Sequence, residues 1–134
     1  MTVVRLIADD LTGALDTAIA FVETRRGVAV HWSGVPVVDP SGSLAIDSGT
    51  REACPAEASR KVAGLVRALP HRDGTIHYAK LDSLLRGQAA AEIAGWIDVL
   101  EPDRCIIAPA FPHHGRITRG GVQYLRSDAD ERAI

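Results

Sequence analysis

The sequence predicts an α/β domain of three layers, in which a mainly parallel sheet of about five strands carries helices on both faces in a Rossmann-like arrangement. Short apolar runs alternate along the chain with segments whose apolar residues recur every three or four positions. Strands that are separated by helices run parallel, and a parallel sheet is covered on both faces. Hydrophobic residues make up 46% of the 134 residues, which is enough for one core of ordinary size. We therefore expect a single domain over residues 1–134.

The expected strands are short apolar runs that end in polar residues. They cover residues 3–8, 28–32, 44–47, 75–81 and 104–109, and a further strand is indicated at 122–125. Residues 33–43 are rich in Gly, Pro and Ser and are typical of a loop. Cys105 lies inside the fifth run, so we expect a small buried side chain there.

Three helices are expected between these strands. The first has Thr12 as a candidate N-cap and ends at Gly27, the second begins near Pro55, and the third covers residues 88–100. Their predicted buried faces are Leu15, Ala18, Ile19 and Val22 in the first, Val62, Leu65, Val66 and Leu69 in the second, and Ile93, Trp96, Ile97 and Leu100 in the third.

Composition argues against several classes of partner. The net charge is −2 and aromatic residues make up only 4%, so neither nucleic acid nor an anionic membrane is expected. No apolar run approaches the roughly 20 residues of a membrane span, and charge appears too early for a signal peptide. The two cysteines, Cys54 and Cys105, form no CxxC pair, which favours a reduced cytoplasmic compartment.

Polar clusters follow four of the expected strands. They are Asp9 and Asp10 after the first strand, Asp47, Ser48 and Arg51 after the third, Lys80, Asp82, Ser83 and Arg86 after the fourth, and Arg116 after the fifth. Ligands of an open parallel sheet bind outside the carboxyl ends of its strands. We therefore expect these ten residues to form one binding site.

The chemistry of this cluster suits a small ligand that is both acidic and polyhydroxylated. Arg86 or Arg116 can bind a carboxylate through two parallel hydrogen bonds. Asp9, Asp10 and Asp82 can accept hydrogen bonds from the hydroxyls of a sugar. Each residue also has a simpler interpretation. Taken singly, the polar residues before helices are more often N-caps, by roughly two to one, and an internal Arg86–Asp82 salt bridge is the alternative for that pair.

A magnesium site is the other use of aspartates on one sheet edge. Adjacent residues of a strand point to opposite sides, so Asp9 and Asp10 converge on one ion only if the strand ends between them. The neighbours His113 and His114 have no third ligand placed by the sequence, and a solvated loop is the simpler interpretation. We therefore predict no metal site in this chain. No phosphate-binding glycine motif occurs either.

Three motifs carry a resemblance to a known family. They are IADDLTGA at 7–14 with Asp16 after it, KxDSxxRG at 80–87, and APAFPxxGRxT at 108–118. In this order the motifs resemble the N-terminal sugar-binding domain of the four-carbon acid sugar kinase family, long catalogued as a domain of unknown function. Two features depart from the family pattern. Leu84 replaces a threonine, and the hairpin expected after Gly121 is predicted to dissolve into the charged run at 128–132.

The resemblance implies an ATP-dependent kinase of threonate, erythronate or 3-oxo-tetronate. In such proteins a separate C-terminal domain binds the nucleotide, so ATP and Mg²⁺ are expected for a full-length member and neither for this chain. The expected function is therefore that of a substrate-binding domain that is inactive alone, with an unknown catalytic base. The alternatives are a binding module that pairs with a separate nucleotide-binding subunit or forms a homodimer, and a Mg²⁺-dependent phosphatase-like domain.

Overall fold

The computed structural model describes residues 2–22, 27–32, 41–127 and 130–134. Its elements are, in chain order, β1 (Val4–Ala8), α1 (Leu11–Val22), β2 (Val28–His31), β3 (Ser43–Asp47), α2 (Pro55–Ala68), β4 (Ile76–Lys80), α3 (Ala89–Leu100), the 3₁₀ turn Pro112–His114, β5 (Arg116–Arg119), β6 (Val122–Arg126) and β7 (Glu131–Ala133). Two predictions fall outside the described residues. They are the end of the first helix, just before Gly27, and most of the loop at 33–43.

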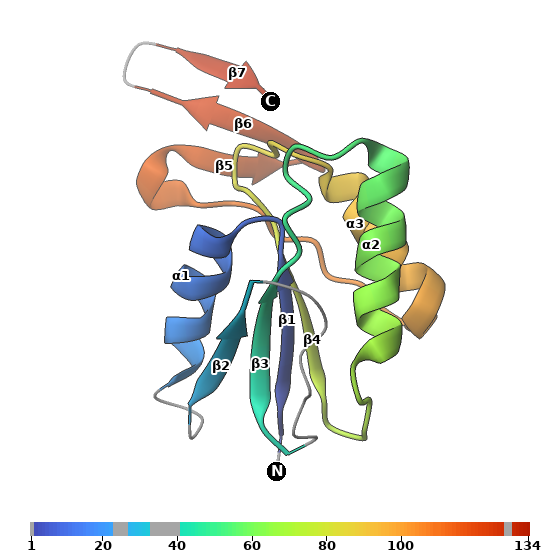
Figure 1. Cartoon of the computed structure of the whole chain (residues 1–134). Helices are drawn as coiled ribbons and strands as arrows, with labels where there is room; N and C mark the ends of the chain where they lie inside the picture. Colours follow the sequence, from blue (N-terminus) through green and yellow to red (C-terminus); the bar gives the residue numbers. More distant parts are fainter. Residues whose placement is uncertain (1, 23–26, 33–40, 128–129) are drawn as a thin grey trace.

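A parallel four-stranded sheet forms the centre of the molecule, in the order β2-β3-β1-β4. In its register, Ile7 of β1 lies opposite Ile46 of β3 and Ala79 of β4. Helix α1 covers one face of this sheet, whereas α2 and α3 lie on the other side (Figure 1). The predicted three-layer α/β architecture is therefore confirmed, with four parallel strands in this sheet.

The central strand β1 supplies side chains to both cores because its residues alternate between the two faces of the sheet. Val4, Leu6 and Ala8 pack toward α1, together with Ala45 of β3. Ile7 belongs to the second cluster, between the sheet and the opposite helices. The second helix was predicted correctly, since it begins at Pro55 and all four residues of its expected face are buried.

Helix α1 shows the sheet a face that shares only Ala18 with the one predicted. Its buried residues are Gly13, Ala14, Thr17 and Ala18. Leu15, Ile19 and Val22 face outward, and Ile19 is 71% exposed. Small side chains are the ones that allow a helix to lie close to a sheet, and this packing overrides the apolar periodicity. The cap also differs from the prediction, because Asp10 precedes the helix and Thr12 lies inside it.

Helix α3 packs mainly on α2. A Cβ atom on Gly95 would lie 2.6 Å from the backbone oxygen of Ser59, so the two helices approach closely at this point. Trp96 is buried as predicted, whereas Ile97 is partly exposed. The predicted face of α3 is therefore only partly confirmed.

The fifth predicted strand does not form. Residues 104–109 have no strand partner in the described part of the chain, Cys105 is exposed, and Ile106 is 92% exposed. An apolar run becomes a strand only where an edge and a covering layer are both available. In the structure this run stays unpaired beside β4 and α3, where it borders an open cleft. The predictions of a strand and of a buried Cys105 are therefore wrong.

A separate antiparallel sheet, in the order β5-β6-β7, follows this segment. Gly120 and Gly121 make the tight turn between β5 and β6, and the strand expected at 122–125 is confirmed. The predicted loss of the hairpin after Gly121 is wrong, because β7 pairs with β6. The charged residues of this region form cross-strand contacts: Arg119 makes an ion pair with Glu131 and stacks over the ring of Tyr124. No described helix is long and apolar enough to cross a bilayer.

Candidate functional site

The turns that follow β1, β3 and β4 meet at the carboxyl edge of the parallel sheet. Backbone hydrogen bonds join the first two turns: the amide of Ser48 donates to the oxygen of Ala8 at 2.8 Å, and the amide of Thr50 donates to the oxygen of Asp9 at 3.1 Å. The polar residues that the sequence places after these strands are therefore neighbours in space.

Arg51 lies at the centre of this edge and contacts three carboxylates. Its Nε and Nη2 donate to the two oxygens of Asp9 at 2.6 and 2.7 Å. Its Nη1 lies 2.9 Å from Asp10 Oδ2 and 3.9 Å from Asp82 Oδ1. These contacts, the hydrogen bond with Asp9 first, raise the pKa of the Arg51 guanidinium. Because β1 ends at Ala8, Asp9 and Asp10 do converge, and they converge on a cation supplied by the chain.

Asp82 organises the turn after β4. Its Oδ1 and Oδ2 accept hydrogen bonds from Nη2 and Nε of Arg86 at 2.7 and 3.1 Å. The backbone amides of Leu84 and Arg86 also donate to Oδ2. The Arg86 hydrogen bond is the main reason why the pKa of the Asp82 carboxyl falls to about 2. The structure thus contains the internal salt bridge that was the simpler interpretation of this pair.

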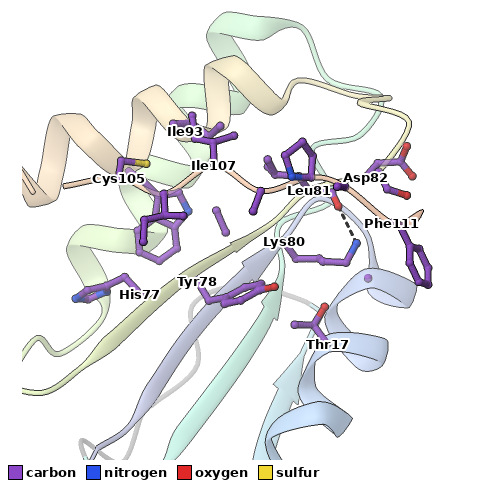
Figure 2. Close-up of a pocket in the computed structure, with 18 of the residues that line it drawn as sticks. Thr17, His77, Tyr78, Lys80, Leu81, Asp82, Ile93, Cys105, Ile107 and Phe111 are labelled. Atoms are coloured by element: carbon purple, nitrogen blue, oxygen red, sulfur yellow. Dashed lines mark hydrogen bonds between the residues drawn. The ribbon is translucent and has the colours of Figure 1, made fainter. Parts of the chain in front are cut away.

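Arg116 and Lys80 keep donors that the described residues do not use. Arg116 Nη1 donates to Ser83 Oγ at 2.7 Å, but its buried Nε has no hydrogen-bond partner in the described part of the chain. Lys80 Nζ donates to the backbone oxygen of Leu81 at 2.8 Å (Figure 2). Both side chains carry a positive charge beside the carboxyl edge of the sheet, so this end of the site favours an anionic or hydroxylated guest.

These residues border an open cleft of about 1180 Å³ between β4, α1, α3 and residues 104–111. Figure 2 shows its two ends: Lys80 and Asp82 lie toward one end, and Ile93, Cys105 and Ile107 toward the other. The predicted site residues that line it are Asp10, Arg51, Lys80, Asp82, Ser83, Arg86 and Arg116. The cleft therefore has a polar end at the carboxyl edge of the sheet.

Three of the predicted site residues do not line the cleft. Asp9 is buried beneath it, where it holds Arg51. Asp47 accepts a hydrogen bond from the amide of Gly49 at 2.7 Å, and Ser48 is buried. Asp47 and Ser48 therefore shape the turn after β3.

Asp10, which precedes α1, acts as a cap as well as a site residue. It accepts a hydrogen bond from the amide of Gly13 at 2.7 Å, in addition to its contact with Arg51.

Sequence analysis missed a buried hydrogen-bonded chain below the turn after β3. Ser48 Oγ donates to the oxygen of Ala8 at 2.8 Å and lies 2.7 Å from Thr50 Oγ1. Thr50 Oγ1 donates in turn to Oε1 of Glu92, in the first turn of α3. Burial is the main reason why the pKa of the Glu92 carboxyl is raised. Its position four residues before the buried Trp96, on the same helix face, was the signal available in the sequence.

Gly87, the last residue of the KxDSxxRG motif, is required by its surroundings. Its φ is +83°, and a Cβ atom would lie 3.0 Å from Asp9 Oδ2 and 3.4 Å from the Arg51 backbone. A side chain here is strained by its backbone conformation and crowds the Asp9 carboxylate. The sequence alone could not show why this motif ends in glycine.

The described residues do not offer a metal site. They contain no group of three or more His, Cys, Asp or Glu residues that is able to hold an ion. The aspartates that suggested magnesium are instead neutralised by Arg51 and Arg86. The donor set of this edge therefore fits a small organic guest better than a cation.

The scan against protein families matches residues 4–133 to a sugar-binding N-terminal domain. This chain belongs to that family. The sugar-binding domain is 36% identical to a D-erythronate kinase of Heliobacterium modesticaldum over 95% of its own length, and 35% identical to a D-threonate kinase of Bordetella bronchiseptica over 90%. It spans only 30% and 31% of those two proteins.

A solved structure shares the fold of the sugar-binding domain. It is a domain of unknown function from Bordetella bronchiseptica, crystallised with bound citrate as a domain-swapped dimer. The TM-score is 0.72 and the identity 36%, over 91% of this chain and 32% of the other. A second crystal form of the same domain matches with a TM-score of 0.71. The fold and the family are therefore established together.

Proposed function

We propose that this domain binds the four-carbon sugar acid of an ATP-dependent kinase, such as threonate, erythronate or 3-oxo-tetronate, at the polar end of the cleft. The observation that carries the proposal is the pair of cations with unused donors, Lys80 and Arg116, beside Asp10 and Asp82. The names of the related kinases and the citrate in the solved relative support an acidic, hydroxylated ligand.

The contacts within the cleft favour particular roles for these side chains. Arg86 uses both Nε and Nη2 on Asp82, whereas Arg116 uses one Nη1 donor on Ser83 and leaves its Nε unpaired. We therefore assign the ligand carboxylate to Arg116, with Lys80 as the second cation. The carboxylates of Asp10 and Asp82 are the acceptors for the ligand hydroxyls.

Phosphoryl transfer needs a nucleotide and its Mg²⁺ placed in line with the acceptor hydroxyl. No glycine-rich phosphate cradle occurs among residues 1–134. In this proposal, ATP and Mg²⁺ are held by protein outside these residues, and the chain alone turns over no ATP. The two free, exposed thiols fit the reduced cytoplasm that we expect for such metabolism.

A second candidate is a binding module that pairs with a separate nucleotide-binding subunit or with another copy of itself. The outward apolar stripe of α1, formed by Leu11, Leu15, Ile19 and Val22, favours it. Exposed apolar patches mark interaction surfaces, and the solved relatives are domain-swapped dimers. Sedimentation of the pure chain, with and without a candidate nucleotide-binding protein, distinguishes monomer, homodimer and heterodimer.

Thermal unfolding against D-threonate, D-erythronate, 3-oxo-tetronate and citrate, each with and without Mg²⁺-ATP, tests the main proposal. A ligand at ~100 times its dissociation constant stabilises the fold by about 2.7 kcal/mol, which raises the Tm by several degrees. We expect such a shift with a sugar acid and none with ATP. No shift with any of the four acids, or ATP turnover by the pure chain, contradicts the proposal.

The variant Arg116→Ala places the ligand, with Arg126→Ala as the matched control. Arg126 is an exposed arginine of β6 that does not line the cleft. Loss of a charge-assisted hydrogen bond costs about 1.5–3 kcal/mol, so we expect affinity for the sugar acid to fall roughly 10- to 100-fold in Arg116→Ala only. Equal affinities in the two variants would reject the assignment of Arg116.

A further inference from the structure

Glu92 is a buried carboxylate that lies outside the cleft. It is 6% exposed, sits in the first turn of α3, and does not line the cavity. A buried carboxylate is costly unless hydrogen bonds compensate it. Its partner is the hydroxyl of Thr50, which is itself fully buried. This contact joins α3 to the turn after β3, two elements that are 42 residues apart.

The turn that receives this contact is held from two sides. On one side, Glu92 accepts from Thr50, and Thr50 shares a hydrogen bond with Ser48. On the other side, the amides of Thr50 and Arg51 donate to the backbone oxygen of Asp9 at 3.1 and 3.3 Å. The Glu92 contact therefore reaches the residue directly before Arg51 in the turn.

We propose that Glu92 is a positioning residue of the site: through Thr50 and Ser48 it fixes the turn that carries Arg51, and so aligns Asp9 beneath the cleft and Asp10 in its wall. The inference rests on the proposed function, since it concerns the same site. The two parallel hydrogen bonds between Arg51 and Asp9 tolerate only small displacements of either backbone. Glu92 acts through other residues, because its own carboxylate lies away from the cavity.

The test uses the ¹⁵N-labelled full chain and follows the Nε–H signal of Arg51 by NMR, assigned with Arg51→Lys. Glu92→Leu removes the acceptor at similar volume, whereas Glu92→Gln keeps an acceptor oxygen for Thr50. We expect hydrogen exchange of the Arg51 Nε–H to become at least about tenfold faster in Glu92→Leu and to stay near the wild-type rate in Glu92→Gln. Unchanged exchange in a folded Glu92→Leu protein overturns the proposal.

Thr50→Val provides an independent version of the test if Glu92→Leu fails to fold. It removes only the hydroxyl that joins Glu92 to the turn, at nearly constant shape. Faster exchange at Arg51 Nε–H is again the expected result, and unchanged exchange contradicts the proposal. Circular dichroism confirms that each variant remains folded.

Ligand affinity separates this inference from the proposed function. With D-threonate or D-erythronate as the probe, we expect about tenfold weaker binding in Thr50→Val and Glu92→Leu, and recovery in Glu92→Gln. Equal affinities in all variants overturn the positioning role. If no sugar acid binds the wild-type chain, the proposed function fails, and the exchange of the Arg51 signal still decides the role of Glu92.

Discussion

Arg51 holds together three carboxylates that would otherwise repel one another at the edge of the sheet. Asp9 and Asp10 follow β1, and Asp82 follows β4, so the guanidinium joins turns from two parallel strands. The sequence indicated that these residues meet, because strand ends share one edge. It indicated the Arg86–Asp82 pair, which lies within one turn, but not the pairing of Arg51 with Asp9 and Asp10, since that depends on the distance between turns. Glu92 shares a helix face with the buried Trp96, but its partner Thr50 comes from the turn after β3, and the sequence does not show that these two segments meet.

The Asp82 carboxyl makes stability depend on pH in a defined direction. Its pKa in the folded state, about 2, lies below the ordinary value of 3.8. The stabilisation is therefore present above about pH 4 and is lost as the pH falls through 2. We expect Asp82→Asn to lower the free energy of unfolding at pH 7 by roughly 1–2 kcal/mol, after allowance for solvent screening.

Urea unfolding between pH 2 and 7 checks this prediction. The difference between wild type and Asp82→Asn should shrink as the pH falls from about 4 toward 2, because the carboxyl is protonated first in the unfolded state and, near pH 2, in the folded state as well. The exposed Asp103 after α3 provides the control, and Asp103→Asn should leave the free energy of unfolding within about 0.5 kcal/mol of wild type. A difference for Asp82→Asn that stays constant down to pH 2 would contradict the argument.

Helices α1 and α2 show when apolar periodicity predicts a buried face and when it does not. In α2 the only large apolar side chains lie on one face, so that face is buried. Helix α1 offers two faces, one of larger apolar side chains and one that includes Gly13, Ala14 and Ala18. The face with the small side chains packs against the sheet. Which of two possible faces packs inward depends on the shape of the opposing surface, and a single sequence does not contain that information.

The contact between α2 and α3 depends on Gly95. A Cβ atom there would lie 2.6 Å from the backbone oxygen of Ser59, which cannot move as a flexible side chain can. We expect Gly95→Ala to destabilise the fold by about 1–3 kcal/mol despite the better helix propensity of alanine. Denaturant unfolding measures this change.

Gly64, in the interior of α2, is the matched control. A Cβ atom there meets nothing within 4 Å. We therefore expect Gly64→Ala to stabilise the fold by about 0.5–1 kcal/mol, because alanine loses less conformational freedom on folding. If both variants changed the free energy of unfolding in the same direction, close packing at Gly95 would not explain the effect of Gly95→Ala.

At the scale of the whole molecule, two sheets of different kinds meet beside the cleft. Gln123 of β6 joins them: its amide donates to the backbone oxygens of Ser83 and Pro109 at 3.0 and 3.3 Å, and it is almost fully buried. Arg116 adds its hydrogen bond to Ser83. Polar contacts therefore join the antiparallel sheet to the turn after β4, whereas β1 and β3 lie between two apolar cores.

We expect Gln123→Ala to loosen the antiparallel sheet without unfolding the parallel one. Hydrogen exchange should become at least about tenfold faster for the backbone amides of β5 and β6 and remain near wild type for β1 and β3. Val122→Thr, an exposed β-branched substitution on the same strand, is the control and should change neither. Uniform acceleration across both sheets would show that they unfold as one unit.

Strand β4 ends the parallel sheet, and no other described strand pairs with its outer edge. Ile106 and Ile107 stand in solvent on the segment that borders the same cleft. An open edge next to apolar side chains is a template on which an extended piece of another polypeptide can add, and natural proteins usually protect such edges with charge, proline or a cover. We therefore expect the purified chain to aggregate through this edge, and to do so more as its concentration rises.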